Sequence, residues 1–66
     1  MTPEQKAKIV EEMVAWLEAR NSIISKRSDS IRDMNTHMVI GMARCLEHLG
    51  YKAEIDFDNC TVTISE

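Results

Sequence analysis

The hydrophobic period of the sequence changes at Gly50, from the 3.6 residues of an α-helix to the two residues of a β-strand. Before Gly50, apolar residues recur at three- and four-residue steps over two long segments. After it, they alternate strictly with polar residues. The change predicts an α+β chain of ααββ order. Two amphipathic helices, at about 3–20 and 30–49, are expected to pack on a C-terminal two-stranded antiparallel hairpin at about 51–57 and 60–65.

The hairpin is predicted by agreement between its turn and its alternation. The odd positions of 51–57 and the even positions of 60–65 are apolar, and Asp58-Asn59 between them suits a two-residue loop because both residues tolerate positive φ. This loop puts every apolar residue on one face of the hairpin. The expected cross-strand pairs are Phe57 with Cys60, Ile55 with Val62, and Ala53 with Ile64.

The first helix is expected to begin at Pro3 with a capping box, because Thr2 stands at the N-cap and Gln5 at the third helical position. Val10 and Val14 widen its apolar arc to roughly 160°, more than one packed helix needs. We expect the surplus to face either the hairpin or another subunit. Asn21 is a suitable end.

The second helix is expected to start at Ser30 and to stop at Gly50, which supplies the left-handed residue that ends helices. Its methionines form a stripe at helical spacing. We interpret the stripe as core packing, but its exposure in a monomer would favour a groove for a partner. The expected inward face consists of Ile31, Met34, Met38, Met42, Cys45, Leu46 and Leu49.

Residues 21–30 contain four serines and lack clear periodicity, which favours a connecting loop. Ile23 and Ile24 are expected to tuck beneath that loop. The alternative is a second helix that begins near Ser22 and runs unbroken.

The chain of 66 residues allows one domain, 1–66, and a domain of this size is marginal without a disulfide, a metal or a partner chain. Two cysteines exclude a disulfide framework, so homodimerisation is the expected source of additional stability. Asn35 lies inside the apolar arc, where a polar residue can fix oligomeric state, and Ile40 is a lone apolar residue on the polar side. The candidate interface residues are Val10, Val14, Trp16, Asn35 and Ile40.

The charge balance is mildly acidic, with 11 Asp and Glu against 8 Lys and Arg, which disfavours binding to a polyanion. Lys26, Arg27 and Arg32 are candidate anion contacts, although a solvated connection is the favoured interpretation. The N-terminus does not resemble a signal peptide, and no apolar run approaches the length of a membrane span. These features and the free thiols predict a cytoplasmic protein.

No catalytic motif is present, and neither a cofactor nor a metal is expected. His37 and His48 are some 16 Å apart along a helix and cannot share an ion. Cys45 and Cys60 are both expected to point inward, either as free thiols or close enough to pair. Short acidic chains of this kind are common among phage and mobile-element proteins, so such an origin is kept as a hypothesis.

The predicted function is that of a small non-enzymatic interaction or regulatory module. It would dock on a partner protein and form a homodimer. One alternative is a nucleic-acid-binding accessory protein that uses the basic segment 26–32. The other is a structural subunit of a larger assembly.

Overall fold

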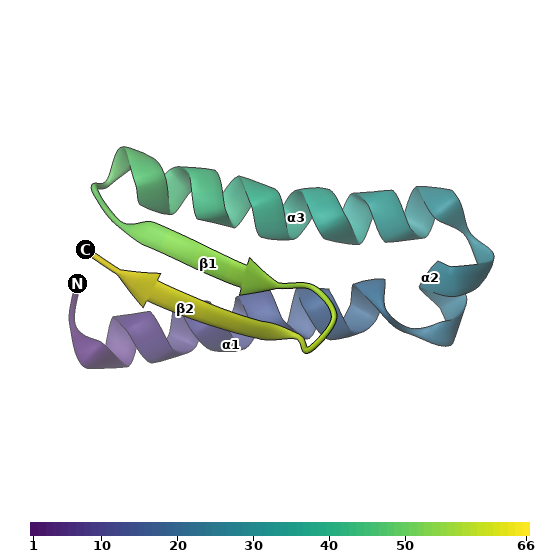
Figure 1. Ribbon diagram of the computed structural model, residues 1–66, viewed down its shortest axis with the longest axis horizontal. Helices are drawn as coiled ribbons and strands as arrows, with labels where there is room; N and C mark the ends of the chain where they lie inside the picture. Colours follow the sequence, from purple (N-terminus) through teal and green to yellow (C-terminus); the bar gives the residue numbers. More distant parts are fainter.

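A computed structural model describes all residues, 1–66, and shows an α+β fold in two layers (Figure 1). The elements are α1 (Pro3–Arg20), α2 (Ile23–Arg27), α3 (Asp29–His48), β1 (Lys52–Asp56) and β2 (Thr61–Ser65). The long helices α1 and α3 lie antiparallel, and the hairpin packs across one side of the pair. The short helix α2 closes one end, and the chain termini lie together at the other. The prediction of helices packed on a C-terminal hairpin is therefore confirmed.

The beginning of α1 is confirmed in detail. Thr2 Oγ1 accepts a hydrogen bond of 3.1 Å from the backbone N–H of Gln5, and Gln5 Oε1 accepts one of 2.9 Å from the backbone N–H of Thr2. Two of the N–H groups that a helix start leaves unpaired are thus satisfied by the capping box. The helix ends at Arg20, with Asn21 as its C-cap.

The connection between the long helices is not the predicted loop, because Ile23–Arg27 form the helix α2. Nor is it a continuous helix, because Ser28 has extended backbone angles (φ −137°, ψ 111°). The serines act as N-caps: Ser22 Oγ accepts from the N–H of Ser25, and Ser28 Oγ accepts from that of Ile31. The second helix therefore begins at Asp29, one residue before the predicted start, and its N-cap is Ser28 rather than Ser30.

The prediction for the isoleucine pair is wrong as well. Ile23 and Ile24 are 69% and 66% exposed, and Ser25 is the buried residue of α2. The reason is that Ser22 and Ser28 set the helical phase of this segment, and in that phase Ser25 faces the interior. Two adjacent apolar residues consequently lie at the outer end of the molecule.

The hairpin has the predicted register, with Ile55 opposite Val62 and Ala53 opposite Ile64. Its loop differs from the prediction, because the ladder stops at Asp56 and Thr61 and leaves residues 57–60 as a four-residue turn. The positive φ falls on Cys60 (53°), not on Asp58-Asn59. Asp56 carboxylate oxygens accept hydrogen bonds from Asp58 and Asn59 and so satisfy the loop backbone without the predicted pairing of Phe57 with Cys60.

The core lies where α1, α3 and the hairpin meet. At the end of α3, Gly50 has a φ of 89°, and the N–H of Tyr51 donates to the carbonyl of Leu46 at 2.9 Å, as in the predicted left-handed helix end. This reversal sends the chain back along the helices as β1. The buried apolar residues are Met13, Leu17, Val39, Ala43, Leu46 and Ile64.

Candidate functional site

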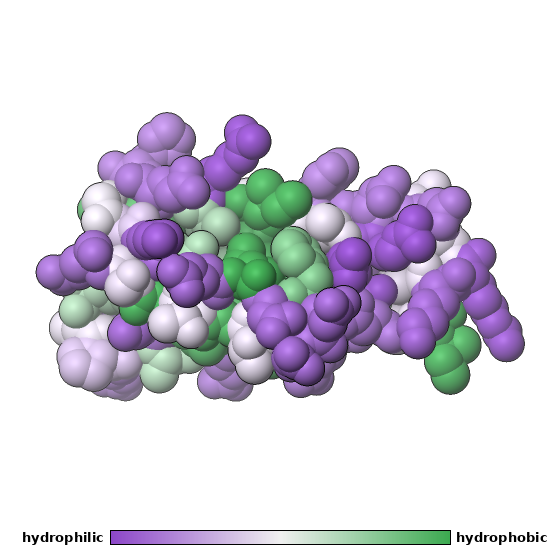
Figure 2. Space-filling model, viewed as in Figure 1, coloured by the Kyte–Doolittle hydropathy of each residue, from purple (hydrophilic) through white to green (hydrophobic).

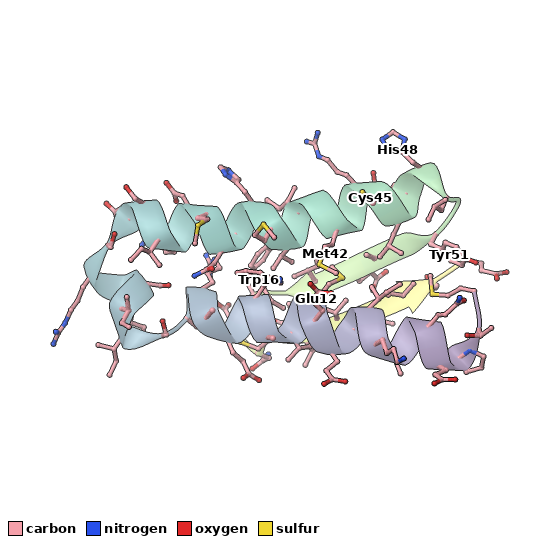
Figure 3. All side chains as sticks on the ribbon, turned by 180° about the vertical axis from the view of Figure 1, so that it is seen from behind. Glu12, Trp16, Met42, Cys45, His48 and Tyr51 are labelled. Atoms are coloured by element: carbon pink, nitrogen blue, oxygen red, sulfur yellow. The ribbon has the colours of Figure 1, made fainter.

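The side of the helical pair opposite the hairpin is not covered by any other part of the chain (Figure 3). Two methionines of α3 and the leucine at its C-cap are substantially exposed: Met34 at 55%, Met38 at 41% and Leu49 at 72%. We call this side of α1 and α3 the open face. It is formed by Ile9 and Trp16 of α1 and by Met34, Met38, Gly41, Met42, Cys45 and Leu49 of α3.

The exposure of Met34 and Met38 corrects the prediction that the methionine stripe fills the core, and Met42 is only half-buried. The buried line of α3 runs instead through Asn35, Val39, Ala43 and Leu46, one position further round the helix. Val39, Ala43 and Leu46 belong to the core cluster, and the methionines of the wide apolar arc are turned outward.

A groove of about 450 Å³ runs along the open face between the two helices. Its lining is mainly apolar, and His37 is the only residue of the lining with a polar side chain. The apolar walls include Ile9, Met38, Met42, Cys45, Leu46 and Leu49.

Three side chains come together beside the groove, and Met42 is the one of them that lines it. Glu12 and Trp16 of α1 and Met42 of α3 point toward one another between the helices (Figure 3). Trp16 is half-buried and packs against the core, while Glu12 is exposed. The centre of the open face therefore presents an indole ring beside a carboxylate.

The opposite face of the molecule has a different character. Figure 2 shows mainly hydrophilic atoms over the hairpin side, with an apolar area between α3 and β1 and another at the α2 end. This follows from the register, which puts the charges and hydroxyls of both strands on the outer side of the hairpin.

The structure separates the predicted interface residues on α1. Trp16 lies on the open face. Val10 and Val14 are half-buried and stand at helical steps from Asn21, whose Nδ2 donates to the carbonyl of Phe57 in the hairpin loop at 2.7 Å. This side of α1 faces the hairpin. The apolar residues of the wide arc of α1 are therefore divided between the hairpin and the open face.

The predicted interface residues on α3 do not belong to the open face. Asn35 is only 4% exposed, and its Nδ2 donates to Ser25 Oγ at 3.1 Å. Ser25 Oγ in turn donates to the carbonyl of Ala19 at 2.6 Å, so the hydrogen bonds connect all three helices. Ile40 is half-buried, at a helical step from the buried Ala43.

A second polar network, which the sequence did not indicate, joins the end of α1 to α3 and the hairpin. Arg20 Nε donates to Thr36 Oγ1 at 2.8 Å, and the guanidinium lies 4.9 Å from the centre of the Phe57 ring. Asn21 bridges to the loop through Phe57, as described above. These contacts fix how far α1 and α3 are shifted relative to each other along their axes.

The candidate anion contacts do not form a concentrated positive site. Lys26 and Arg27 are exposed on α2, but Arg32 donates to Asp29 Oδ1 at 2.9 Å and is thereby partly neutralised. No group of three or more His, Cys, Asp or Glu residues is arranged to hold a metal ion.

The two cysteines are free, and Cys45 is exposed on the open face. The prediction that Cys45 points inward is therefore wrong, for the same reason as for the methionines. Cys60 is half-buried in the hairpin loop, where its Sγ accepts from Asn21 Nδ2 at 3.2 Å.

The fold and the open face define a small α+β protein with an unpartnered apolar helical surface. No family model, curated protein or solved structure matches the chain. None of its helices has the length and apolar character required to cross a bilayer.

Proposed function

We propose that the protein is a non-enzymatic interaction module that docks its open face on another polypeptide. The observation that carries this proposal is the exposure of Met34, Met38 and Leu49 along one side of α3. Contiguous apolar side chains on a surface favour association, because their burial removes them from water. Methionine side chains are flexible and polarisable, so such a surface adapts well to a partner.

The groove supports binding rather than catalysis. Its potentially reactive side chains are His37 and Cys45, which are eight residues apart on α3. Two helical turns separate them by about 12 Å, too far for a nucleophile and its base. A polypeptide segment or an amphipathic helix is the kind of partner that an apolar groove on a helical surface accepts.

Two further features accompany the proposal. The docked form is a homodimer, since so small a domain gains stability from a second chain. The site of action is a reducing compartment such as the cytoplasm, which the exposed free thiol of Cys45 supports. A role as a subunit of a larger assembly would use the same open face.

The test introduces a charge into the open face with Met38→Glu. The matched control is Ile24→Glu, which places the same charge on an exposed apolar residue of α2. Association is measured with the purified full chain by sedimentation equilibrium and with an extract of the source cell by quantitative cross-linking. We expect M38E to lose associations that I24E retains, with both variants folded by circular dichroism. A folded M38E variant that retains every association of the wild type would contradict the proposal.

A further inference from the structure

The end of the molecule formed by α2 combines apolar with basic side chains. Ile23 and Ile24 are 69% and 66% exposed, and Lys26 and Arg27 are exposed next to them on the same short helix. Figure 2 shows an apolar area at this end with hydrophilic atoms around it. We call these four residues the α2 tip. We propose that the α2 tip binds the surface of an anionic lipid bilayer, with the two isoleucines inserted between the headgroups.

The phase of α2 turns the four side chains outward together. Ser25 is fully buried and therefore marks the inner side of the helix. At about 100° per residue, Ile23 and Arg27 lie within roughly 20° of the outermost line, and Ile24 and Lys26 follow on either side of them. Each isoleucine thus has a basic residue as its neighbour on the outer surface, and no acidic residue interrupts this arc.

The charges of the chain are concentrated by sign toward the same end. Residues 20–32 contain four of the eight basic residues and one of the eleven acidic ones, so this segment carries a net charge of +3 within a chain of −3. Arg20 is engaged with Thr36, and Arg32 with Asp29. The two basic residues of the α2 tip form no ion pair within the chain, so they are available to the phosphates of lipid headgroups.

The acidic remainder of the chain does not oppose this contact when the molecule stands on its end. The α2 helix lies at one end of a long axis of 37 Å, and the chain termini lie at the other end (Figure 1). At physiological ionic strength the Debye length is about 8 Å, so charges far along this axis are screened from the surface. The end-on orientation also leaves the open face free, so the two surfaces do not compete.

The shape of the α2 tip favours a lipid surface over a folded protein. No pocket or groove of the molecule is lined by a residue of the segment 20–32, so the tip offers no recess that could enclose a partner's side chain. The interface of a bilayer is fluid and closes around a small apolar protrusion. The long stems of Lys26 and Arg27 allow their charges to stay at the level of the headgroups.

Two isoleucines and two free charges predict weak and reversible binding. One basic side chain near an anionic surface increases partitioning by roughly fivefold. A single fatty acyl chain, whose apolar surface is larger, gives only marginal membrane binding on its own. We therefore expect partitioning at millimolar lipid that requires the anionic headgroups and the isoleucines together. Such a contact orients the protein on a membrane and requires no membrane-spanning segment.

The first test examines the charges by cosedimentation of the full chain with vesicles. We expect binding to equimolar phosphatidylcholine and phosphatidylglycerol, and none to phosphatidylcholine alone. K26E/R27E should bind at least tenfold more weakly. The matched control K6E/R44E makes the same change in net charge at exposed positions outside the tip, and it should stay within about twofold of the wild type. A wild type that does not bind the anionic vesicles, or an equal loss in both double variants, would overturn the proposal.

The second test examines the isoleucines. I23Q/I24Q keeps every charge and changes only exposed side chains, so the fold is expected to be retained by circular dichroism. We expect its binding to the anionic vesicles to be at least tenfold weaker. The matched control is L49Q, which removes an equally exposed apolar side chain (72%) at the opposite end of α3 and should not change binding. Undiminished binding of I23Q/I24Q would refute insertion.

Two further outcomes separate a lipid surface from the other possible partners. Binding of duplex DNA that K26E/R27E abolishes and I23Q/I24Q retains, without binding to vesicles, would assign the basic residues to nucleic acid and overturn the proposal. The open-face variant M38E should bind the anionic vesicles as the wild type does. A loss in M38E as large as that in I23Q/I24Q would place the lipid contact on the open face and would also overturn it.

Discussion

Asn35 of α3 donates a side-chain hydrogen bond of 3.1 Å to Ser25 Oγ of α2, and both residues are buried. Ser25 Oγ in turn donates a hydrogen bond to the carbonyl of Ala19 at the end of α1. The small helix α2 is thus held against the long helices by polar side chains that are withdrawn from water. A polar residue so enclosed stabilises the fold only while its partner is present.

We expect Ser25→Ala to destabilise the fold by about 1–3 kcal/mol, because it leaves the buried Asn35 amide without its acceptor. The carbonyl of Ala19 keeps a hydrogen bond from Ser22 Oγ at 2.7 Å. Urea denaturation of S25A, N35A and the double variant measures the effect, and the exposed Ser30→Ala is the control. The double variant should lose clearly less than the sum of the single ones. Additive losses would contradict a direct coupling between the two side chains.

A second prediction concerns the start of α3. Ser28→Ala removes the hydroxyl that accepts the N–H of Ile31, so it should cost about 1 kcal/mol of unfolding free energy. Ser30 lies inside the first turn, so Ser30→Ala should change the free energy of unfolding by less than about 0.5 kcal/mol. Thermal and urea unfolding of the two variants distinguish the two possible N-caps. A larger loss of stability in S30A than in S28A would identify Ser30 as the N-cap.

The comparison of Ser28 with Ser30 shows where the sequence is least informative. Both serines can cap a helix, and the local sequence favours Ser30, because Asp33 follows it at capping-box spacing whereas Ile31 follows Ser28. The choice depends on Ser25 and Asn35, because their hydrogen bond requires α2 to be helical and α3 to begin immediately after it. A contact between segments decides this boundary, and local propensity does not contain that information.

The hairpin register was predictable because only one register places all apolar side chains on one face, and it is confirmed by the pairs Ile55–Val62 and Ala53–Ile64. The phase of α3 was not, since its apolar arc is wide enough to be covered along either edge. A small residue such as Ala43 gives little signal in a hydrophobic pattern, yet Ala43 is part of the buried core. The stripe that includes Met34 and Met38 is the edge that stays exposed.

Nucleic-acid binding offers a third prediction, because it is the alternative to docking on a protein. The basic side chains at the α2 end are Lys26 and Arg27, while Arg32 is engaged with Asp29 and the chain carries a net charge of −3. We expect no binding of duplex or single-stranded DNA at low salt, where phosphate contacts are strongest. Fluorescence anisotropy at two salt concentrations measures it. Binding that weakens with salt and is lost in the Lys26→Glu, Arg27→Glu double variant would favour the nucleic-acid alternative.

The last prediction concerns acid stability and the hairpin loop. Hydrogen bonds from Asn59, first from its side chain and then from its backbone, lower the pKa of Asp56 below its ordinary value of 3.8. The ionised form is favoured in the folded state. Its stabilising contribution is therefore complete above the unfolded pKa and is lost as the pH falls through the folded pKa.

Asp56→Ala should accordingly destabilise the fold at about pH 6, and its difference from the wild type should shrink toward about pH 2.5. Urea midpoints at the two pH values measure this difference, and NMR titration of the Asp56 carboxyl carbon measures the pKa itself. Asn59→Ala is the companion variant, because it removes the largest cause of the shift and should move the pKa of Asp56 back toward 3.8. A difference between wild type and D56A that grows on acidification would show that the carboxylate does not stabilise the loop. The hairpin would then depend on its strand pairs alone.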